Sequence, residues 1–180
     1  AGDKLKQLGI KRLLIHHDGG PYLYDTGLLK DIKEDMERCG IQVWELSGVK
    51  PNPRLDLVYQ GIRLVRQEGI QFILAIGGGS VIDSSKAIGA GAQYEGDVWD
   101  FFSKGLRVAR SLLVGVVLTC PATGSESGDV CVINNTGTGQ KLLTSSQALR
   151  PVMAFMNPLL TTSLPPFVTA CSVTDMFSHV

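Results

Sequence analysis

The sequence predicts an α/β fold built on a doubly wound parallel sheet. Three short apolar runs, each typical of a buried strand, alternate with three segments whose apolar residues recur at helical spacing. Turns rich in glycine or proline separate these segments. This alternation is typical of right-handed crossovers between parallel strands, so we expect the loops that follow the strands to gather at one edge of the sheet.

The first half of the chain supplies three strand–helix units. Gly40 and Gly69 follow the first two amphipathic segments, where glycine commonly ends a helix. The third apolar run leads directly into glycines and a third helical segment. We therefore expect strands over residues 12–16, 41–46 and 72–76, and helices over residues 28–39, 55–68 and 80–88.

The second half of the chain adds strands and a terminal helix. Two short runs around an Asn-Asn-Thr-Gly turn indicate a β-hairpin laid beside the main sheet. Proline at residues 165 and 166 suits the first turn of a helix, which we expect to continue to the final residue. The predicted elements are strands over residues 112–118 and 152–156, a hairpin over 130–133 and 141–144, and the helix from 163.

Charge and composition exclude several classes of function. Lys+Arg and Asp+Glu number 17 each, so no broad positive surface is expected for nucleic acid or anionic lipid. The apolar runs are too short to span a membrane, and the polar start, AGDKLKQLG, does not resemble a secretory signal. The four cysteines lie far apart without a CxxC pair. We therefore expect reduced thiols and a cytoplasmic protein.

A glycine-rich loop joins the third strand to the third helix. Glycines permit close approach of the backbone to a ligand, and free N–H groups at a helix N-terminus suit a pyrophosphate. Ser80 is expected to cap this helix and to donate to phosphate. The alternative is a plain strand-to-helix turn, because GGGS is neither a GxGxxG fingerprint after a first strand nor a P-loop.

Four segments, in the expected order, resemble motifs of the iron-containing (group III) alcohol dehydrogenases. They are IGGGSVIDSSKA at residues 76–87, PATGSE at 121–126, LPP at 164–166 and DMFSH at 175–179. Within that family, residues 47–53 and 96–100 most resemble the NADP-linked butanol dehydrogenase branch. The resemblance implies a Rossmann-like nucleotide-binding domain, here residues 1–162. It also implies that residues 163–180 begin a helical metal-binding domain whose further histidine ligands lie outside this sequence.

The resemblance also implies which residues bind the cofactor. The pyrophosphate would lie at the glycine-rich loop, the nicotinamide end near Asp83 and a ribose near Lys141, with two threonines lining the cleft. Lys141 has the alternative of a solvated hairpin lysine. The implied set is Gly78, Gly79, Ser80, Asp83, Thr119, Thr123 and Lys141.

The residue after the first strand bears on the choice between NAD and NADP. Where the branch usually carries a Gly-Gly-Ser turn, this chain has Asp18 before two glycines. A carboxylate at that place accepts a hydrogen bond from a ribose 2′-hydroxyl and repels a 2′-phosphate. The resemblance to the NADP-linked branch favours NADP(H), whereas Asp18 favours NAD(H). By a small margin, we expect NADP(H) as the cofactor.

Asp175 and His179 are the candidate metal ligands. Their i, i+4 spacing places both on one helix face, and a carboxylate oxygen with an imidazole nitrogen suits Fe²⁺ or Zn²⁺. By itself such a pair also occurs by chance on surface helices. His16 and His17 lie by the first strand and are not expected to replace the ligands of the missing part.

The resemblance thus implies reversible hydride transfer between an alcohol and an aldehyde or ketone, with NADP or NAD as cofactor and Fe²⁺ or Zn²⁺ in the longer enzyme. The resemblance adds a homodimer as the expected assembly. Two alternatives stay open. One is a glycerol dehydrogenase or dehydroquinate synthase, which share the glycine-rich loop. The other is a nucleotide-binding module without chemistry, because these 180 residues supply only two metal ligands and are expected to be inactive alone.

Overall fold

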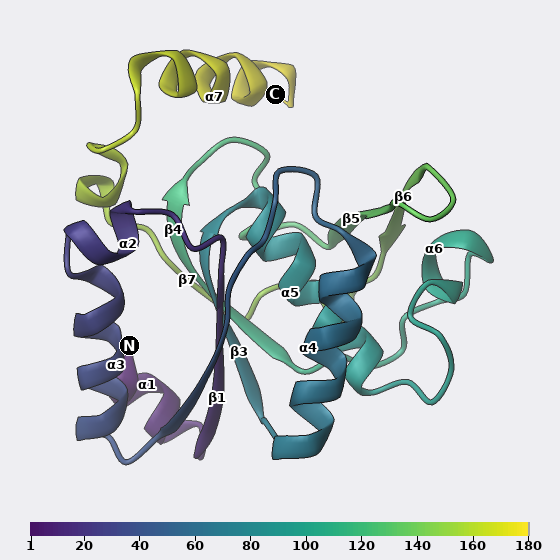
Figure 1. The fold of residues 1–180 in the computed structure, drawn as a ribbon, viewed down its shortest axis with the longest axis horizontal. Helices are drawn as coiled ribbons and strands as arrows, with labels where there is room; N and C mark the ends of the chain where they lie inside the picture. Colours follow the sequence, from purple (N-terminus) through teal and green to yellow (C-terminus); the bar gives the residue numbers. More distant parts are fainter. Residues whose placement is uncertain (180) are drawn as a thin grey trace.

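A computed structural model describes residues 1–179, and its centre is a five-stranded sheet in the order β2-β1-β3-β4-β7 (Figure 1). Every neighbouring pair in this sheet is parallel. The doubly wound parallel fold predicted from the sequence is confirmed. The strands are β1 (Arg12–His17), β2 (Gln42–Leu46), β3 (Phe72–Gly78), β4 (Leu113–Cys120) and β7 (Met153–Phe155).

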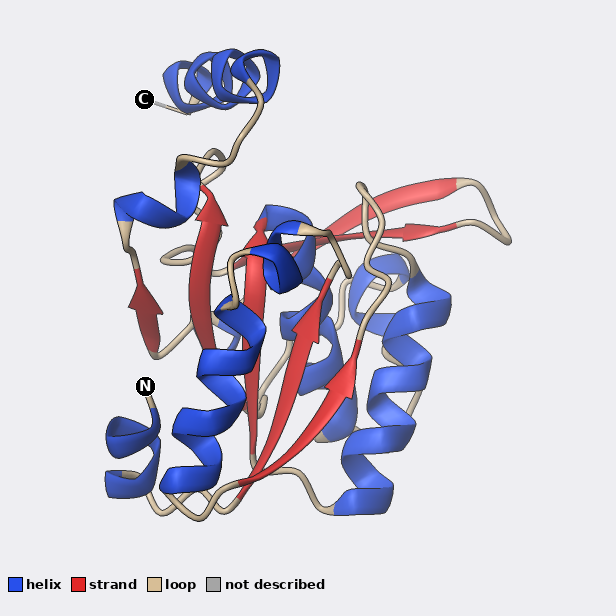
Figure 2. Ribbon diagram, turned by 60° about the vertical axis from the view of Figure 1, so that its left-hand side comes forward, coloured by secondary structure: helices blue, strands red, loops and turns tan. Residues whose placement is uncertain are grey.

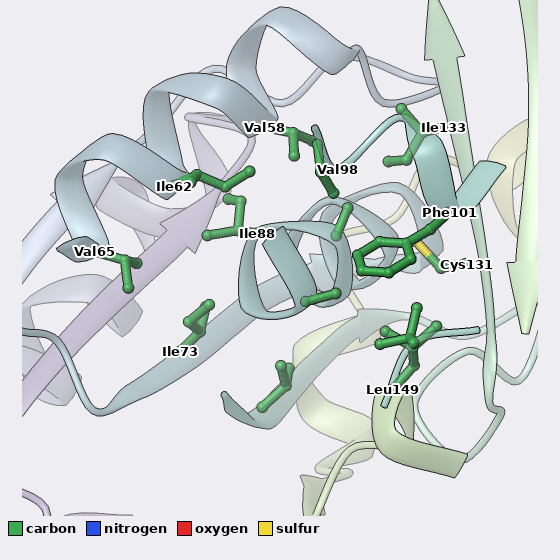
Figure 3. Close-up of a cluster of buried hydrophobic side chains, with 14 of the residues drawn as sticks. Val58, Ile62, Val65, Ile73, Ile88, Val98, Phe101, Cys131, Ile133 and Leu149 are labelled. Carbon is green, nitrogen blue, oxygen red and sulfur yellow. The ribbon is translucent and has the colours of Figure 1, made fainter. Parts of the chain in front are cut away.

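Helices cover both faces of the sheet. On one face, α1 (Gly2–Gln7) and α3 (Leu28–Arg38) pack over alternate residues of β1 and β3. On the other face, α4 (Leu55–Glu68) and α5 (Gly79–Ala92) enclose the larger hydrophobic cluster. Figure 3 shows Val58, Ile62 and Val65 of α4 directed toward Ile88 of α5 and Ile73 of β3. Alternate strand residues therefore serve two separate cores, as a sheet buried on both faces requires.

The strand order places a crevice at one particular point. From β1 the chain crosses to β2 on one side, and later strands are added on the other side, beginning with β3. In open α/β sheets, ligands bind beyond the carboxyl ends of the strands at the point where the winding direction reverses. Here that point lies between β1 and β3. Asp18 follows β1 and the glycine-rich loop ends β3, so both predicted segments border the crevice.

The hairpin is formed by β5 (Val130–Asn135) and β6 (Gln140–Ser145), which pair as a separate two-stranded sheet. The hairpin is confirmed, but its turn lies at residues 136–139 rather than at 134–137. It is not hydrogen-bonded beside the main sheet. Instead Cys131 and Ile133 of β5 belong to the hydrophobic cluster over α4 and α5, because their side chains bury against those helices.

Several short elements carry no periodic signal in the sequence. They span too few residues for an apolar repeat to be recognised, and packing rather than propensity fixes them. Residues 2–7, which the sequence suggested only as a polar start, form α1, with Leu5 fully buried. The others are α2 (Tyr22–Asp25), α6 (Asp100–Ser103), η1 (Gln147–Leu149) and η2 (Pro158–Thr161).

The terminal helix α7 (Pro166–Ser178) lies beyond the carboxyl ends of the parallel strands, away from the body of the fold (Figures 1 and 2). It has proline in its first turn, as predicted, but it begins at Pro166 rather than at residue 163 and ends at Ser178, with His179 as its C-cap. Ser172 is its one buried residue among those described, and Phe167 and Phe177 are about four-fifths exposed, at 79% and 80%. Within residues 1–179, no helix combines the length and apolar character needed to cross a membrane.

Candidate functional site

The junction between β3 and α5 leaves a helix N-terminus free of side-chain caps. Gly78 is the N-cap residue, and among the described residues no side chain accepts a hydrogen bond from the first turn of α5. Ser80 lies inside that first turn, so the prediction that it caps the helix is wrong. The first N–H groups of a helix have no partner within the helix and carry partial positive charge. An anion can therefore be bound at this junction by backbone donors.

The glycines of the loop allow it to approach a second loop closely. A side chain at Gly78 would bring its Cβ within 3.0 Å of the Cys120 carbonyl oxygen, and one at Gly79 within 2.9 Å of Thr123 Oγ1. Real Cβ atoms are rarely found so close to other atoms. Glycine at residues 78 and 79 thus lets the loop pack closely against residues 120–123. The sequence alone did not reveal this requirement.

A cleft of about 510 Å³ opens beside this junction. Its walls come from the start of α5, from the loop at residues 121–129, from the hairpin and from residues 52 and 53. Of the eight predicted cofactor residues, five line it: Gly79, Ser80, Asp83, Thr123 and Lys141. His179, one of the two candidate metal ligands, lines it too. The structure therefore brings together residues from distant parts of the sequence at one cleft.

Asp83 is held by the hairpin and by the 121–129 loop. Its Oδ1 accepts a hydrogen bond from Ser125 Oγ at 2.7 Å, and its Oδ2 accepts one from the Val132 backbone N–H at 3.0 Å. Burial raises the pKa of the Asp83 carboxyl, while these hydrogen bonds and nearby Lys86 act in the opposite direction. Both carboxylate oxygens are already engaged, so Asp83 is fixed in orientation where it lines the cleft.

Three more predicted residues lie near the crevice but outside the lining of that cleft. Gly78 precedes Gly79 directly. Thr119, buried at the end of β4, donates a long 3.4 Å hydrogen bond to the Tyr22 hydroxyl, which donates to Asp18 Oδ1 at 3.3 Å. Asp18 Oδ1 also accepts from the Gly20 N–H at 2.8 Å. Tyr22 thus links the ends of β1 and β4.

Tyr22 was not predicted from the sequence. No motif marks it, and only its position in the short helix α2 brings its hydroxyl between the two predicted residues. Burial raises the pKa of Tyr22 to about 12, so it remains a neutral phenol at physiological pH.

Lys141 lines the cleft and has a hydrogen-bond partner on another segment. Its Nζ donates a 2.7 Å hydrogen bond to Asn52 Oδ1. Asn52 has a left-handed backbone conformation, with φ of 58°, which asparagine tolerates better than most residues. Lys141 is thus an exposed hairpin lysine that lines the cleft and is hydrogen-bonded to Asn52. The sequence analysis did not single out Asn52, because residues 47–53 were used there only to compare the chain with one branch of the family.

The two histidines of β1 serve the fold. His16 is fully buried; its Nδ1 donates to the Leu46 carbonyl at 2.8 Å and its Nε2 accepts from Ser84 Oγ at 2.8 Å. Desolvation lowers the pKa of His16 to about 4, so the ring is neutral. His17 bonds to Glu45 at 3.0 Å and accepts from the Gly19 N–H. Both ring nitrogens of each histidine are thus engaged in hydrogen bonds within the fold.

Asp175 and His179 lie together on α7 as the helical spacing requires. Asp175 Oδ1 is 3.7 Å from His179 Nε2, and both side chains are about half exposed. The donor set suits Fe²⁺ or Zn²⁺. Among residues 1–179, however, no group of three or more histidine, cysteine, aspartate or glutamate side chains is arranged to hold a metal ion. These two side chains would therefore supply part of a coordination shell.

A second hollow of about 390 Å³ is also lined by residues of the 121–129 loop. Its lining is mainly apolar and includes Leu118, Pro121, Met156 and Met176. Met176 belongs to α7, so this helix borders both hollows. The sequence analysis did not predict this hollow, because its apolar residues come from four separate segments.

The fold is a Rossmann-like α/β domain, and its β3–α5 junction presents a helix N-terminus without a side-chain cap. The family model described as iron-containing alcohol dehydrogenase matches residues 1–158. The chain therefore belongs to the iron-containing alcohol dehydrogenase family, as its motifs indicated.

Individual relatives agree with this assignment. A probable NADH-dependent butanol dehydrogenase of Bacillus subtilis is 42% identical over 98% of this chain and 45% of its own length. An NADPH-dependent aldehyde reductase of Escherichia coli is 38% identical over 93% of this chain and 43% of its own length. The crystal structure of an NADH-dependent butanol dehydrogenase from Thermotoga maritima matches with a TM-score of 0.94 at 37% identity, over 99% of this chain and 44% of that one. The chain thus spans less than half the length of these relatives.

Proposed function

We propose that this protein is a metal-dependent alcohol dehydrogenase that transfers hydride reversibly between an alcohol and NAD(P)⁺. One observation carries the proposal: the uncapped N-terminus of α5 and His179 of the DMFSH segment face the same cleft. A dinucleotide site and a metal ligand are thus adjacent. Within the family that the motifs establish, this adjacency is what hydride transfer at a metal-bound alcohol requires.

Each predicted residue has a role in this proposal. Backbone N–H groups at Gly79 and Ser80 bind the pyrophosphate, and Asp83 and Thr123 border the nicotinamide end. Lys141, anchored by Asn52, donates to a ribose hydroxyl. Thr119 donates a hydrogen bond to Tyr22, which bonds to Asp18 at the end of β1, and so helps to shape the crevice there. Residues 1–162 form the nucleotide-binding domain, and residues 163–180 begin the helical one.

Asp175 and His179 would hold the metal together with ligands from outside this chain. Bound Fe²⁺ or Zn²⁺ supplies Lewis acidity that lowers the pKa of an alcohol. The apolar lining of the neighbouring hollow, with Leu118 and Met176, fits the hydrocarbon part of a small alcohol or aldehyde. Four unpaired cysteines support a cytoplasmic location, and a homodimer is proposed from the family.

NAD(H) is the cofactor that the site favours. Asp18 lies at the carboxyl end of β1, is exposed, and keeps Oδ2 free of protein hydrogen bonds in the described structure. A negative charge there accepts from a 2′-hydroxyl and repels a 2′-phosphate. The names of the relatives include both NADH-dependent and NADPH-dependent enzymes, so they do not decide between the two cofactors. We therefore give more weight to Asp18, which favours NAD(H), than to the branch resemblance, which favoured NADP(H).

The test is an assay of the full-length natural protein that carries this sequence. With butanol and NAD⁺ it should turn over, lose activity with a chelator and regain it with Fe²⁺ or Zn²⁺. Cofactor binding, followed by NADH fluorescence, should survive chelation because the α5 junction needs no metal. Cofactor binding without turnover, under any metal, would instead favour a nucleotide-binding module.

A further inference from the structure

Lys86 is a fully buried lysine on α5, one turn after Asp83. Its side chain has no exposed surface, and its Nζ donates three hydrogen bonds: to Ser125 Oγ at 2.8 Å, to the Val130 carbonyl at 2.9 Å and to the Gly128 carbonyl at 3.0 Å. Lysine is almost never fully buried unless its charge is paired. Its burial in a small domain therefore calls for a specific explanation.

The hydrogen-bond directions define the charge of this group. Carbonyl oxygens can only accept, and Ser125 Oγ already donates its proton to Asp83 Oδ1. All three partners of Lys86 Nζ therefore accept, which requires three N–H donors and hence an ammonium. Burial lowers the pKa of Lys86 and raises that of Asp83, and the attraction between the two charges, with Nζ and Oδ1 4.0 Å apart, acts against both of these shifts.

The partners of Lys86 share one property. Ser125, Gly128 and Val130 all line the cofactor cleft, whereas Lys86 does not. The ammonium lies behind the cleft wall and connects three segments: helix α5, the 121–129 loop and the first residue of the hairpin. The same loop carries Thr123, whose Oγ1 lies where a side chain at Gly79 would meet it.

We propose that Lys86 is a positioning residue of the cofactor site: its ammonium holds the 121–129 loop and the base of the hairpin against α5, which sets the width of the cleft and the orientation of Asp83. The proposal rests on the proposed function, since it assumes that the cleft binds a nicotinamide dinucleotide. Lys86 acts through Ser125 and Asp83 and does not touch the cofactor itself.

The test replaces Lys86 with methionine, which keeps the apolar stem but removes the charge and all three donors. In the full-length protein, Lys86→Met should raise the NADH dissociation constant and the KM for NAD⁺ at least about tenfold. The kcat at saturating NAD⁺ should fall less than about threefold, because the variant loses ground-state positioning rather than a reacting group.

Ser84→Ala is the matched control. Ser84 is also buried on α5 and hydrogen-bonded, but its partner is His16 of β1, on the side away from the 121–129 loop. This variant should lower the melting temperature and leave the NADH dissociation constant unchanged within about twofold. A purely structural role for Lys86 predicts that both variants lose stability and neither loses cofactor affinity, and that result would overturn the proposal.

If Lys86→Met does not fold, Ser125→Ala takes its place, because it removes one acceptor of Lys86 and the donor to Asp83. An NADH dissociation constant raised at least about threefold supports the proposal, and an unchanged one contradicts it. A wild-type protein that binds neither NADH nor NADPH overturns the proposed function and this proposal together, whereas wild-type binding with unchanged variants overturns this proposal alone.

Discussion

Helix α5 and His179, the C-cap of α7, both line the proposed cofactor cleft, yet the surroundings of the two helices differ sharply. Ten of the 14 residues of α5 are buried, and its polar side chains Ser84, Ser85 and Lys86 all have hydrogen-bond partners. Only one of the 13 residues of α7 is buried, and that residue, Ser172, makes a 3.5 Å contact with Cys120. The first helix is thus mostly buried in the fold, whereas the second is mostly exposed.

The difference separates two kinds of site. At the start of α5 the anion-binding geometry follows from packing within this chain, because Gly78 and Gly79 lie against residues 120–123. On α7, the spacing of Asp175 and His179 follows from the helix alone, and nothing among the described residues holds either side chain in a fixed orientation apart from the other. We therefore expect the chain's own residues to preorganise cofactor binding but not metal binding.

Replacing a metal ligand should separate the two sites most strongly. In the full-length protein, Asp175→Ala should lower kcat at least about a thousandfold, since bound metal supplies several kcal/mol of charge stabilisation. The NADH dissociation constant should stay within about twofold, because the α5 junction is unaffected. Thr174→Ala, which removes only a hydroxyl bonded to the Ala170 carbonyl, is the control and should retain activity. A parallel loss of NADH affinity in Asp175→Ala would show that the sites are not separable.

Gly79→Val should give the reverse pattern. The added side chain meets Thr123 and fills the space beside the first N–H groups of α5. NADH affinity should fall about a hundredfold, while circular dichroism and metal content stay as in the wild type. Gly137→Ala, in the exposed turn of the hairpin, is the control substitution. Wild-type NADH affinity in Gly79→Val would remove the loop from the cofactor site.

Acid should lower the free energy of unfolding through protonation of the buried His16 side chain. The pKa of His16 is lowered from 6.5 to about 4 by burial, so the unfolded chain binds this proton more readily than the folded one between those values. The stabilisation is complete above pH 6.5 and is lost as the pH falls toward 4. Between pH 7.5 and 5, the free energy of unfolding should fall by about 2 kcal/mol from this group.

Urea unfolding of the wild type and of His16→Gln at both pH values measures that contribution. The variant should be less stable at pH 7.5, because Ser84 and the Leu46 carbonyl lose their partner. It should also lack about 2 kcal/mol of the wild-type pH dependence. An identical pH dependence in the two proteins would place the acid sensitivity elsewhere.

The smallest effect is expected at Asp18. Asp18→Asn keeps the size of the side chain and its acceptor for Gly20 but removes the negative charge. The ratio of NADPH to NADH affinity should rise about tenfold, because one like-charge repulsion with the 2′-phosphate is lost. Competitive titration of both cofactors gives the ratio directly. No change would mean that the adenosine ribose lies away from the β1 loop.

Much of this molecule could be predicted from local patterns. The strands of the sheet and the helices from residues 28 to 92 carry clear periodicity and glycine stops, and Asp83, Lys141 and His179, which the family resemblance singled out, line one cleft. Tyr22, Asn52 and the role of Lys86 could not be found in this way, because each acts through a partner distant in sequence: Thr119, Lys141 and Ser125 respectively. The misplaced cap at Ser80 has a similar cause, since β3 continues to Gly78 and the helix starts at Gly79.

The central claim is that these 180 residues contain a working cofactor junction but only part of a metal site. The direct measurement uses the 180-residue chain alone, with NADH binding followed by fluorescence and butanol oxidation assayed with added Fe²⁺ or Zn²⁺. We predict NADH binding that Gly79→Val abolishes, and no turnover with either metal. Turnover comparable to that of the full-length protein, or a chain that folds but does not bind NADH, would contradict the account.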